Sequence, residues 1–298
     1  MNVSELVSRQ PDSHEIACER CHEPVDSPYV MVSVEAPVCV GCMTTRELDQ
    51  LGRDLDKAMA LDRLLHRDPP RIDGWEFAVH RSAARYLSGD IVDIHDQGER
   101  FSLAVGDVMG KGLPAAMLRV VLQSGFRAVG TRRPSAIELT ATARSLLDSA
   151  DASMGLVSLF SADVVSETGE VRYVNAGHPP PILVRASSGV EPLTLGATAP
   201  ILGFDVGREV SDTEARRVRM APGDLLAAYS DGVTEAESST GELYETERLV
   251  RALSARRSSN DALSAICRDI VEEIERFSIG RGTDARDDRT LVMLRRVG

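Results

Sequence analysis

The alternation of hydrophobic and polar residues predicts a large domain of paired strands that begins near residue 70. Three segments contain two β-like runs separated by a short turn, and Gly98, Gly169 and Gly189 occupy these turns. Turns of this length join neighbouring strands into antiparallel hairpins. Antiparallel sheet is therefore expected in this part of the chain.

Helical periodicity appears in separate blocks between and after the hairpins. Apolar residues recur every three or four positions after Leu113, in residues 134–150 and in residues 260–277. Ser135 and Glu138 have the spacing of a capping box at the start of the second block. The residues expected to anchor the first helix are Ala116, Met117, Val120 and Val121. Because strands and helices form separate blocks, the pattern favours an α+β fold over a parallel α/β sheet.

A connecting helix is expected upstream, from about Thr45 to His66, and the prolines at 69 and 70 end it. Its leucines form a narrow apolar seam between charged flanks. This helix either lies on the following domain or forms a short coiled coil with a second chain, which would make a homodimer. We therefore expect three parts: residues 1–43, a helical connector over residues 44–69 and a large domain over residues 70–298.

Cysteine spacing predicts a small metal-binding module in the first part. Four of the five cysteines form two C-x2-C pairs with seventeen residues between them. They are Cys18, Cys21, Cys39 and Cys42. Two such turns complete a tetrahedral zinc site, and a short segment with little core benefits from a bound metal. One structural Zn²⁺ in a zinc-ribbon-like module is the expectation, and a thiol redox switch is the alternative left open.

Composition limits the classes of partner. The formal net charge of -12 disfavours nucleic acid and anionic membranes, because both would be repelled. Hydrophobic residues make up 43% of the chain, as in ordinary soluble proteins, yet no apolar run is long enough to span a bilayer. The first residues lack the basic-then-apolar pattern of a signal peptide, so a cytoplasmic location is expected.

Aspartates stand at the ends of several predicted strands. They are Asp90, Asp107, Asp231 and the adjacent pair Asp287 and Asp288. The two-residue period of a strand places Asp107 and Asp231 on apolar, core-facing sides. Two carboxylates about 4 Å apart repel by roughly 4 kcal/mol at an effective dielectric near 20, so a convergent cluster needs protons or cations. Hard oxygen ligands select Mg²⁺ or Mn²⁺.

Six motifs carry a resemblance to a known family. They are "SGDIVDI", "GDVMGKGLPAAM", "YVNAGHPPPILV", "LGFDVG", "YSDGVTEAES" and "DDRTLVML". In this order they resemble the PPM-type metal-dependent protein serine/threonine phosphatases, in the bacterial branch typified by sporulation stage II protein E and the stress-sigma-factor regulators. The resemblance covers about Pro70 to Val297 and implies an α-β-β-α sandwich, two packed antiparallel sheets flanked by helices. It also implies hydrolysis of phosphoserine or phosphothreonine by a metal-bridged water, on a regulatory protein such as an anti-sigma-factor antagonist.

The resemblance also implies roles for individual residues around two Mn²⁺ or Mg²⁺ ions. Asp107 and Asp231 would be the catalytic carboxylates. The implied metal ligands are Asp90, Asp107, the Val108 carbonyl, Asp231 and Asp287. Residues that could lie beside the metals or the phosphate are Arg85, Asp93, Lys111, His178 and Asp288. Two alternatives remain: a non-catalytic, partner-binding scaffold on the same fold, and a phosphatase gated by oxidation of the cysteines.

Overall fold

The computed structural model describes most of the chain after residue 44. The described residues are 18, 20, 42, 44–84, 86–130, 133–149, 155–187, 189–204, 211, 214–278 and 287–297. They belong to two compact units, Met1–Leu61 and Asp62–Gly298. No helix of the described residues is long and apolar enough to cross a membrane.

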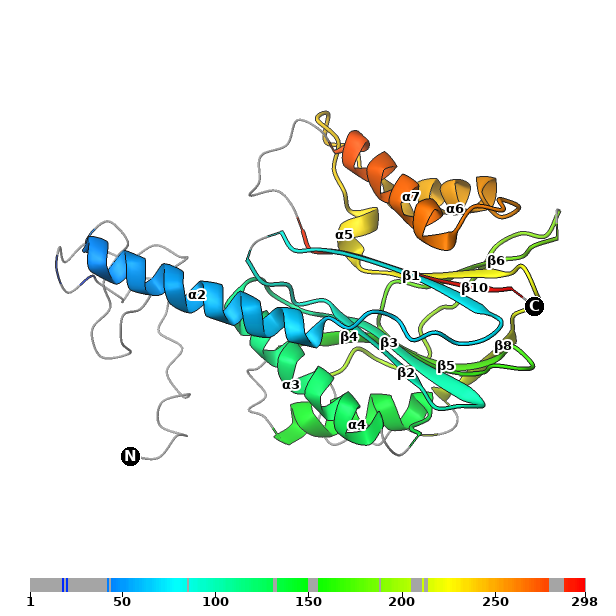
Figure 1. Ribbon diagram of the computed structural model, residues 1–298, viewed down its shortest axis with the longest axis horizontal. Coiled ribbons are helices and arrows are strands. Elements are labelled where there is room, and N and C mark those ends of the chain that lie inside the picture. The colour runs from blue at the N-terminus through cyan, green and yellow to red at the C-terminus, as the bar shows by residue number, and fades with distance from the viewer. Residues whose placement is uncertain are drawn as a thin grey trace. The chain divides into compact units, whose positions relative to one another are not determined.

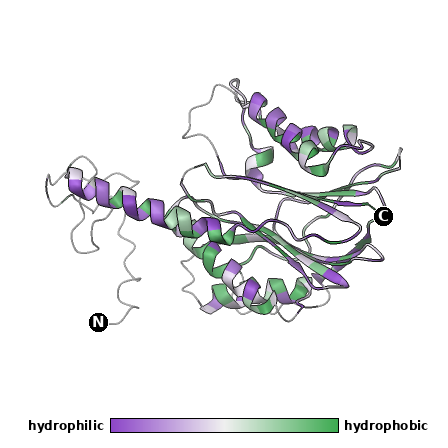
Figure 2. Ribbon diagram, in the orientation of Figure 1, coloured by the Kyte–Doolittle hydropathy of each residue, from purple (hydrophilic) through white to green (hydrophobic). Residues whose placement is uncertain are grey.

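The connecting helix exists as expected: α2 spans Thr45–Leu65. Its start is capped by Thr44 and Glu47, since the Thr44 N–H donates to Glu47 Oε2 (2.8 Å) and the Glu47 N–H donates to Thr44 Oγ1 (3.3 Å). The Arg20 guanidinium also donates to Glu47, at 2.6 Å. Figure 2 shows hydrophilic colouring along most of α2. Dimerisation through this helix stays a prediction.

The second unit contains two five-stranded antiparallel sheets (Figure 1). The first sheet has the order β1 (Trp75–Ser82), β10 (Arg289–Arg296), β9 (Leu225–Tyr229), β6 (Ile182–Val184) and β7 (Leu193–Thr194). The second has the order β2 (Ile91–Asp96), β3 (Arg100–Val108), β4 (Val157–Val165), β5 (Glu170–Ala176) and β8 (Arg216–Arg219). Neighbouring strands are antiparallel in every pair. The expected antiparallel sheets are confirmed.

Helices cover the outer face of each sheet (Figure 1). The second sheet is covered by α3 (Leu113–Gly130) and α4 (Ala136–Ser149). The first is covered by α6 (Glu245–Ala255) and α7 (Leu263–Phe277), and the short helix α5 (Asp231–Thr234) follows β9. This is the α-β-β-α layering that was predicted.

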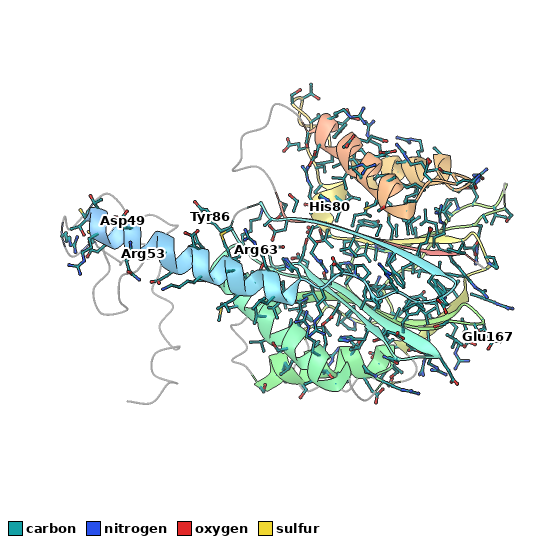
Figure 3. All side chains as sticks on the ribbon, in the orientation of Figure 1. Asp49, Arg53, Arg63, His80, Tyr86 and Glu167 are labelled. Atoms are coloured by element: carbon teal, nitrogen blue, oxygen red, sulfur yellow. The ribbon has the colours of Figure 1, made fainter. Side chains whose placement is uncertain are left out.

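Aromatic and aliphatic side chains fill the space between the sheets (Figure 3). Phe101 of β3 is fully buried, and its ring lies 5.0 Å from that of Trp75 and 5.3 Å from that of Phe77, both on β1. Each such side chain contributes about 1.5–3 kcal/mol by leaving water. These contacts fix the two sheets against each other and so fix the strand ends that carry the aspartates.

Two local predictions hold. The Ser135 N–H donates to Glu138 Oε2 (2.7 Å) and the Glu138 N–H donates to Ser135 Oγ (3.3 Å), which is the expected capping box of α4. Gly98 and Gly169 have φ angles of 85° and 71° in the β2–β3 and β4–β5 turns. These angles explain why glycine occupies both turns.

The expected contact face of α3 was partly wrong. Ala116 is buried, but Met117 and Val121 are 56% and 45% exposed. The helix instead turns Leu118 and Leu122 toward the second sheet. Apolar residues lie on both faces of this helix, so the apolar period alone did not indicate which face is buried.

Candidate metal and phosphate site

The predicted aspartates meet at one end of the sandwich. Asp107 lies near the end of β3, Asp231 follows β9, and Asp287 precedes β10. All three line a cavity of about 580 Å³. Asp90, which precedes β2, is 4% exposed and is close enough for its charge to act on Asp107. Residues up to 197 positions apart in the chain are thus brought together by strand pairing within each sheet and by the packing of one sheet against the other.

These carboxylates repel one another, and the repulsion raises their pKa values. Burial raises the pKa of Asp107, and the charges of Asp90, Asp231 and Asp287 raise it further. Burial also raises the pKa of Asp231, with Asp287 adding to the effect. A group of buried acids with raised pKa values favours bound protons or cations over free carboxylates.

Asp90 is the most enclosed of the cluster. Burial raises its pKa, the charge of Asp288 adds to the rise, and the hydroxyls of Thr290 and Ser230 oppose it. Ser230 Oγ donates to Asp90 Oδ2 at 3.0 Å. The other oxygen, Oδ1, is buried and receives no hydrogen bond of normal geometry from the described residues. A buried acceptor of this kind suits a cation or a water held by one.

Lys111 partly compensates the negative charge. Its Nζ lies 2.9 Å from Asp287 Oδ2, and it lines the cavity together with the aspartates. Lys111 also lowers the pKa of Asp231. The residue predicted to lie near the phosphate is thus at the cavity, as an ion-pair partner of one proposed metal ligand.

The donor set fits a hard divalent cation. The convergent groups are carboxylate oxygens, which Mg²⁺ and Mn²⁺ prefer. Within the described part of the chain, no three His, Cys, Asp or Glu side chains lie in position to hold a metal ion as they stand. The carboxylate of Asp287 is paired with Lys111 in this arrangement.

Asp288 positions the backbone next to Asp90. Its carboxylate accepts hydrogen bonds from the N–H groups of Ala84 (2.7 Å) and Gly89 (2.9 Å). On the other side, Arg119 Nε donates to the carbonyl of Ser88 at 2.9 Å. The loop that presents Asp90 is therefore held from two directions. A role of Asp288 beside the metals stays a prediction.

His178 lines the cavity but is itself buried. Its Nδ1 lies 2.9 Å from Ser158 Oγ, and its backbone N–H donates to Asn175 Oδ1 at 2.8 Å. Burial lowers the pKa of His178 to about 3, with the Tyr229 backbone opposing the shift. The imidazole is therefore neutral at physiological pH and stabilises the turn after β5.

This burial of His178 predicts a pH effect on stability. The pKa of an unfolded histidine is near 6.5, whereas that of folded His178 is about 3. Between these pH values the unfolded chain binds a proton at this residue and the folded chain does not, so a fall in pH favours unfolding. Between pH 6.5 and 5, urea denaturation should show that the natural protein loses about 2 kcal/mol more stability than His178→Gln. If the unfolding free energies of the two proteins changed equally with pH, this prediction would be wrong.

Some of the predicted site residues lie away from the cavity or outside the residues that the structure describes. Asp93 does not join the cluster, because its carboxylate lies 3.3 Å from His95 of the same strand and 3.5 Å from Arg127 of α3. Val108 is buried at the end of β3, with its carbonyl against Gly89. Arg85 lies outside the described residues.

The predicted facing of Asp231 needs a correction. β9 ends at Tyr229, whose ring packs with the first sheet's outer helices rather than between the sheets. Asp231 begins α5, so the two-residue period no longer applies to it. The change from strand to helix brings the carboxylate to the cavity.

Sequence reasoning missed the polar residues that surround the aspartates. Ser230 bonds Asp90, Ser158 contacts His178, and Arg119, only 1% exposed, holds the Ser88 carbonyl. Ser230 was detectable as the residue before Asp231. Ser158 and Arg119 carry no such signal, because each acts through the tertiary fold.

Two of the four cysteines predicted to bind zinc lie outside the residues that the structure describes. Cys21 and Cys39 are not among the described residues. Cys18 is buried, Cys42 is partly exposed, and the Arg20 N–H donates to Cys18 Sγ at 3.4 Å. The Arg20 side chain also donates to the carbonyl of Cys42 at 2.7 Å.

Comparison with solved structures identifies the fold as that of PP2C-type phosphatases. The SiaA PP2C domain of Pseudomonas aeruginosa has a TM-score of 0.67 and 17% identity, covering 85% of this chain and 99% of that one. The RsbU and RsbW domains of a Mycobacterium tuberculosis protein give a TM-score of 0.64 and 25% identity, covering 76% of this chain and 61% of that one. RsbX in complex with magnesium gives 0.56 and 11% identity, covering 76% and 98%.

The chain belongs to the stage II sporulation protein E (SpoIIE) family, whose model matches residues 97–297. Protein IcfG of Synechocystis sp. is 26% identical over 76% of this chain and 39% of its own length. The phosphoserine phosphatase RsbU of Bacillus subtilis is 24% identical over 78% of this chain and 67% of its own length. The chain thus spans well under half of the first relative and about two thirds of the second.

Proposed function

We propose that this protein is a metal-dependent protein serine/threonine phosphatase that acts on a phosphorylated regulatory protein. The observation that carries the proposal is the convergence of Asp107, Asp231 and Asp287 at one cavity of a PP2C-type fold, with the buried Asp90 close enough to act on Asp107. Membership of the SpoIIE family and similarity to a named phosphoserine phosphatase support the same reaction.

Two divalent cations, Mg²⁺ or Mn²⁺, would supply positive charge at the phosphoryl group and activate a water for attack on phosphorus. Asp107 is the carboxylate best placed to be shared, because the charges of Asp90, Asp231 and Asp287 all act on it. Asp231 and Asp287 would hold one cation from the first sheet. Asp90 and the Val108 carbonyl would hold the other from the second sheet.

The chain's own groups would orient the substrate. Lys111 is 48% exposed at the cavity, where its ammonium can pair with a phosphate oxygen as well as with Asp287. Gly110 and Gly112, with φ angles of 107° and 77°, keep the loop beside it free of side chains. Neutral His178 forms part of the cavity wall.

A small anti-sigma-factor antagonist phosphorylated on serine is the proposed substrate. The support is the similarity to RsbU and to a structure that contains RsbU and RsbW domains. We also propose that the four cysteines hold one Zn²⁺, since an N–H donor at Cys18 and a buried sulfur suit a bound thiolate. One equivalent of zinc per chain by elemental analysis would support the module, and less than a tenth would contradict it.

Release of phosphate from p-nitrophenyl phosphate and from a phosphoserine peptide tests the activity directly. Purified chain should hydrolyse both with added Mn²⁺ or Mg²⁺ and neither after chelation by EDTA. Calorimetric titration with Mn²⁺ separates an inactive scaffold from an enzyme, because a scaffold without a metal site would give no binding heat.

A further inference from the structure

One exposed face of α3 is apolar. Leu113, Met117 and Val121 recur every four residues and are 57%, 56% and 45% exposed. Met109, four residues before the helix, is 59% exposed and lines the cavity of the aspartates. We call these four residues the rim stripe. It runs from the cavity along about 12 Å of helix.

The helices α4 and α7 of this unit do not share this feature. The exposed positions of α7 and α4 are charged or polar. They are Ser264, Arg268, Asp269, Glu272, Glu275 and Arg276 on α7, and Glu138, Ser145 and Ser149 on α4. Solvated helix faces normally look like these two. An apolar face that begins at a functional cavity instead marks a surface that another molecule covers.

The position of the cavity indicates which molecule covers the rim stripe. This inference rests on the proposed function. A phosphoprotein whose phosphate reaches the aspartates must cover the cavity rim, where Met109 stands. The cavity wall continues the apolar character with Leu156, Pro179 and Ile201. Apolar contact on this surface favours binding because it removes apolar area from water, and it adds no charge to an already acidic site.

We propose that the rim stripe is the docking surface for the phosphoprotein substrate, and that it receives an apolar helix face lying next to the phosphoserine. The matching partner has leucine, isoleucine or methionine at helical spacing beside the phosphorylated residue. Such contacts act on substrate binding and leave the chemistry at the aspartates unchanged.

Three substrates test this proposal. The first is p-nitrophenyl phosphate, which is too small to extend from the cavity to Met117 and Val121. The second is an amphipathic phosphoserine peptide with leucines three and four residues apart, and the third is the same peptide with glutamines in place of the leucines. The natural protein should have a kcat/KM at least about 10-fold higher for the leucine peptide than for the glutamine peptide.

The variant Met117→Glu/Val121→Glu should lose this preference through a raised KM. Its rate on p-nitrophenyl phosphate should stay within about 2-fold of the natural rate. Ser145→Glu on α4, an exposed position of another helix, is the matched control and should keep the preference. Circular dichroism on all three proteins checks that each one is folded.

Equal kcat/KM values of the natural protein for the two peptides would overturn the docking surface while leaving the phosphatase intact. Absence of any metal-dependent hydrolysis of p-nitrophenyl phosphate would remove the proposed function and the docking surface together. Sedimentation velocity tests the remaining occupant, a second copy of the chain. A dimer that Met117→Glu/Val121→Glu dissociates, with the peptide preference unchanged, would assign the stripe to self-association and overturn the proposal.

Discussion

Asp107→Asn should reduce metal-dependent phosphate release at least about 100-fold. Asp107 is the carboxylate on which the charges of the other aspartates act, and we propose that both cations share it. The amide keeps the size of the carboxylate but has only one oxygen to offer a cation, and it cannot balance two positive ions. The rate on p-nitrophenyl phosphate with saturating Mn²⁺ measures the loss. Titration calorimetry should show weaker Mn²⁺ binding in the same variant.

The stability of the metal-free protein separates this effect from misfolding. Burial and four neighbouring carboxylates oppose the ionised form of Asp107, so the asparagine variant should melt no lower than the natural protein when EDTA is present. Asp269→Asn, an exposed position on α7, makes the same change in net charge and should keep full activity. A rate for Asp107→Asn within 3-fold of the natural rate would end the proposal of a carboxylate-held metal site.

The strand pattern was informative wherever strands are regular. β3 continues without a break to Val108, so the two-residue period correctly placed Asp107 on the face of Phe101 and Val105. The same period failed at Asp231, because β9 ends two residues earlier and a helical turn follows. Periodicity is reliable within an element and carries no information across its end.

Sequence distance limits what could be foreseen at the site. That Asp90 and Asp287 come together depends on sheet order and on the packing of one sheet against the other, which local patterns do not encode. The motif order supplied that information through resemblance. Asp90 and Asp93 belong to the same motif, but they are three residues apart, so the two-residue period of a strand places them on opposite faces. Asp93 accordingly faces Arg127 of α3.

Gly232→Ala should damage both the stability of the protein and the proposed metal site. A Cβ at this position would lie 2.1 Å from the carbonyl oxygen of Asp288 and 3.1 Å from the Cβ of Asp287, with no flexible side chain to give way. The added methyl group must push α5 away from the start of β10, which separates Asp231 from Asp287. We expect a loss of about 1–3 kcal/mol in unfolding free energy. Mn²⁺ affinity should fall at least about 10-fold, as for other disturbances just behind a metal ligand.

Gly196→Ala is the matched control, since a Cβ there meets no atom within 4 Å and the residue is exposed. Urea denaturation with EDTA present measures the packing cost alone, and calorimetric titration with Mn²⁺ measures the effect on the site. If Gly232→Ala lost stability but bound Mn²⁺ with natural affinity, Asp231 and Asp287 would not share a cation. Natural behaviour in both measurements would mean that the ends of β9 and β10 are not in contact at Gly232, and the close approach that builds the site would be refuted.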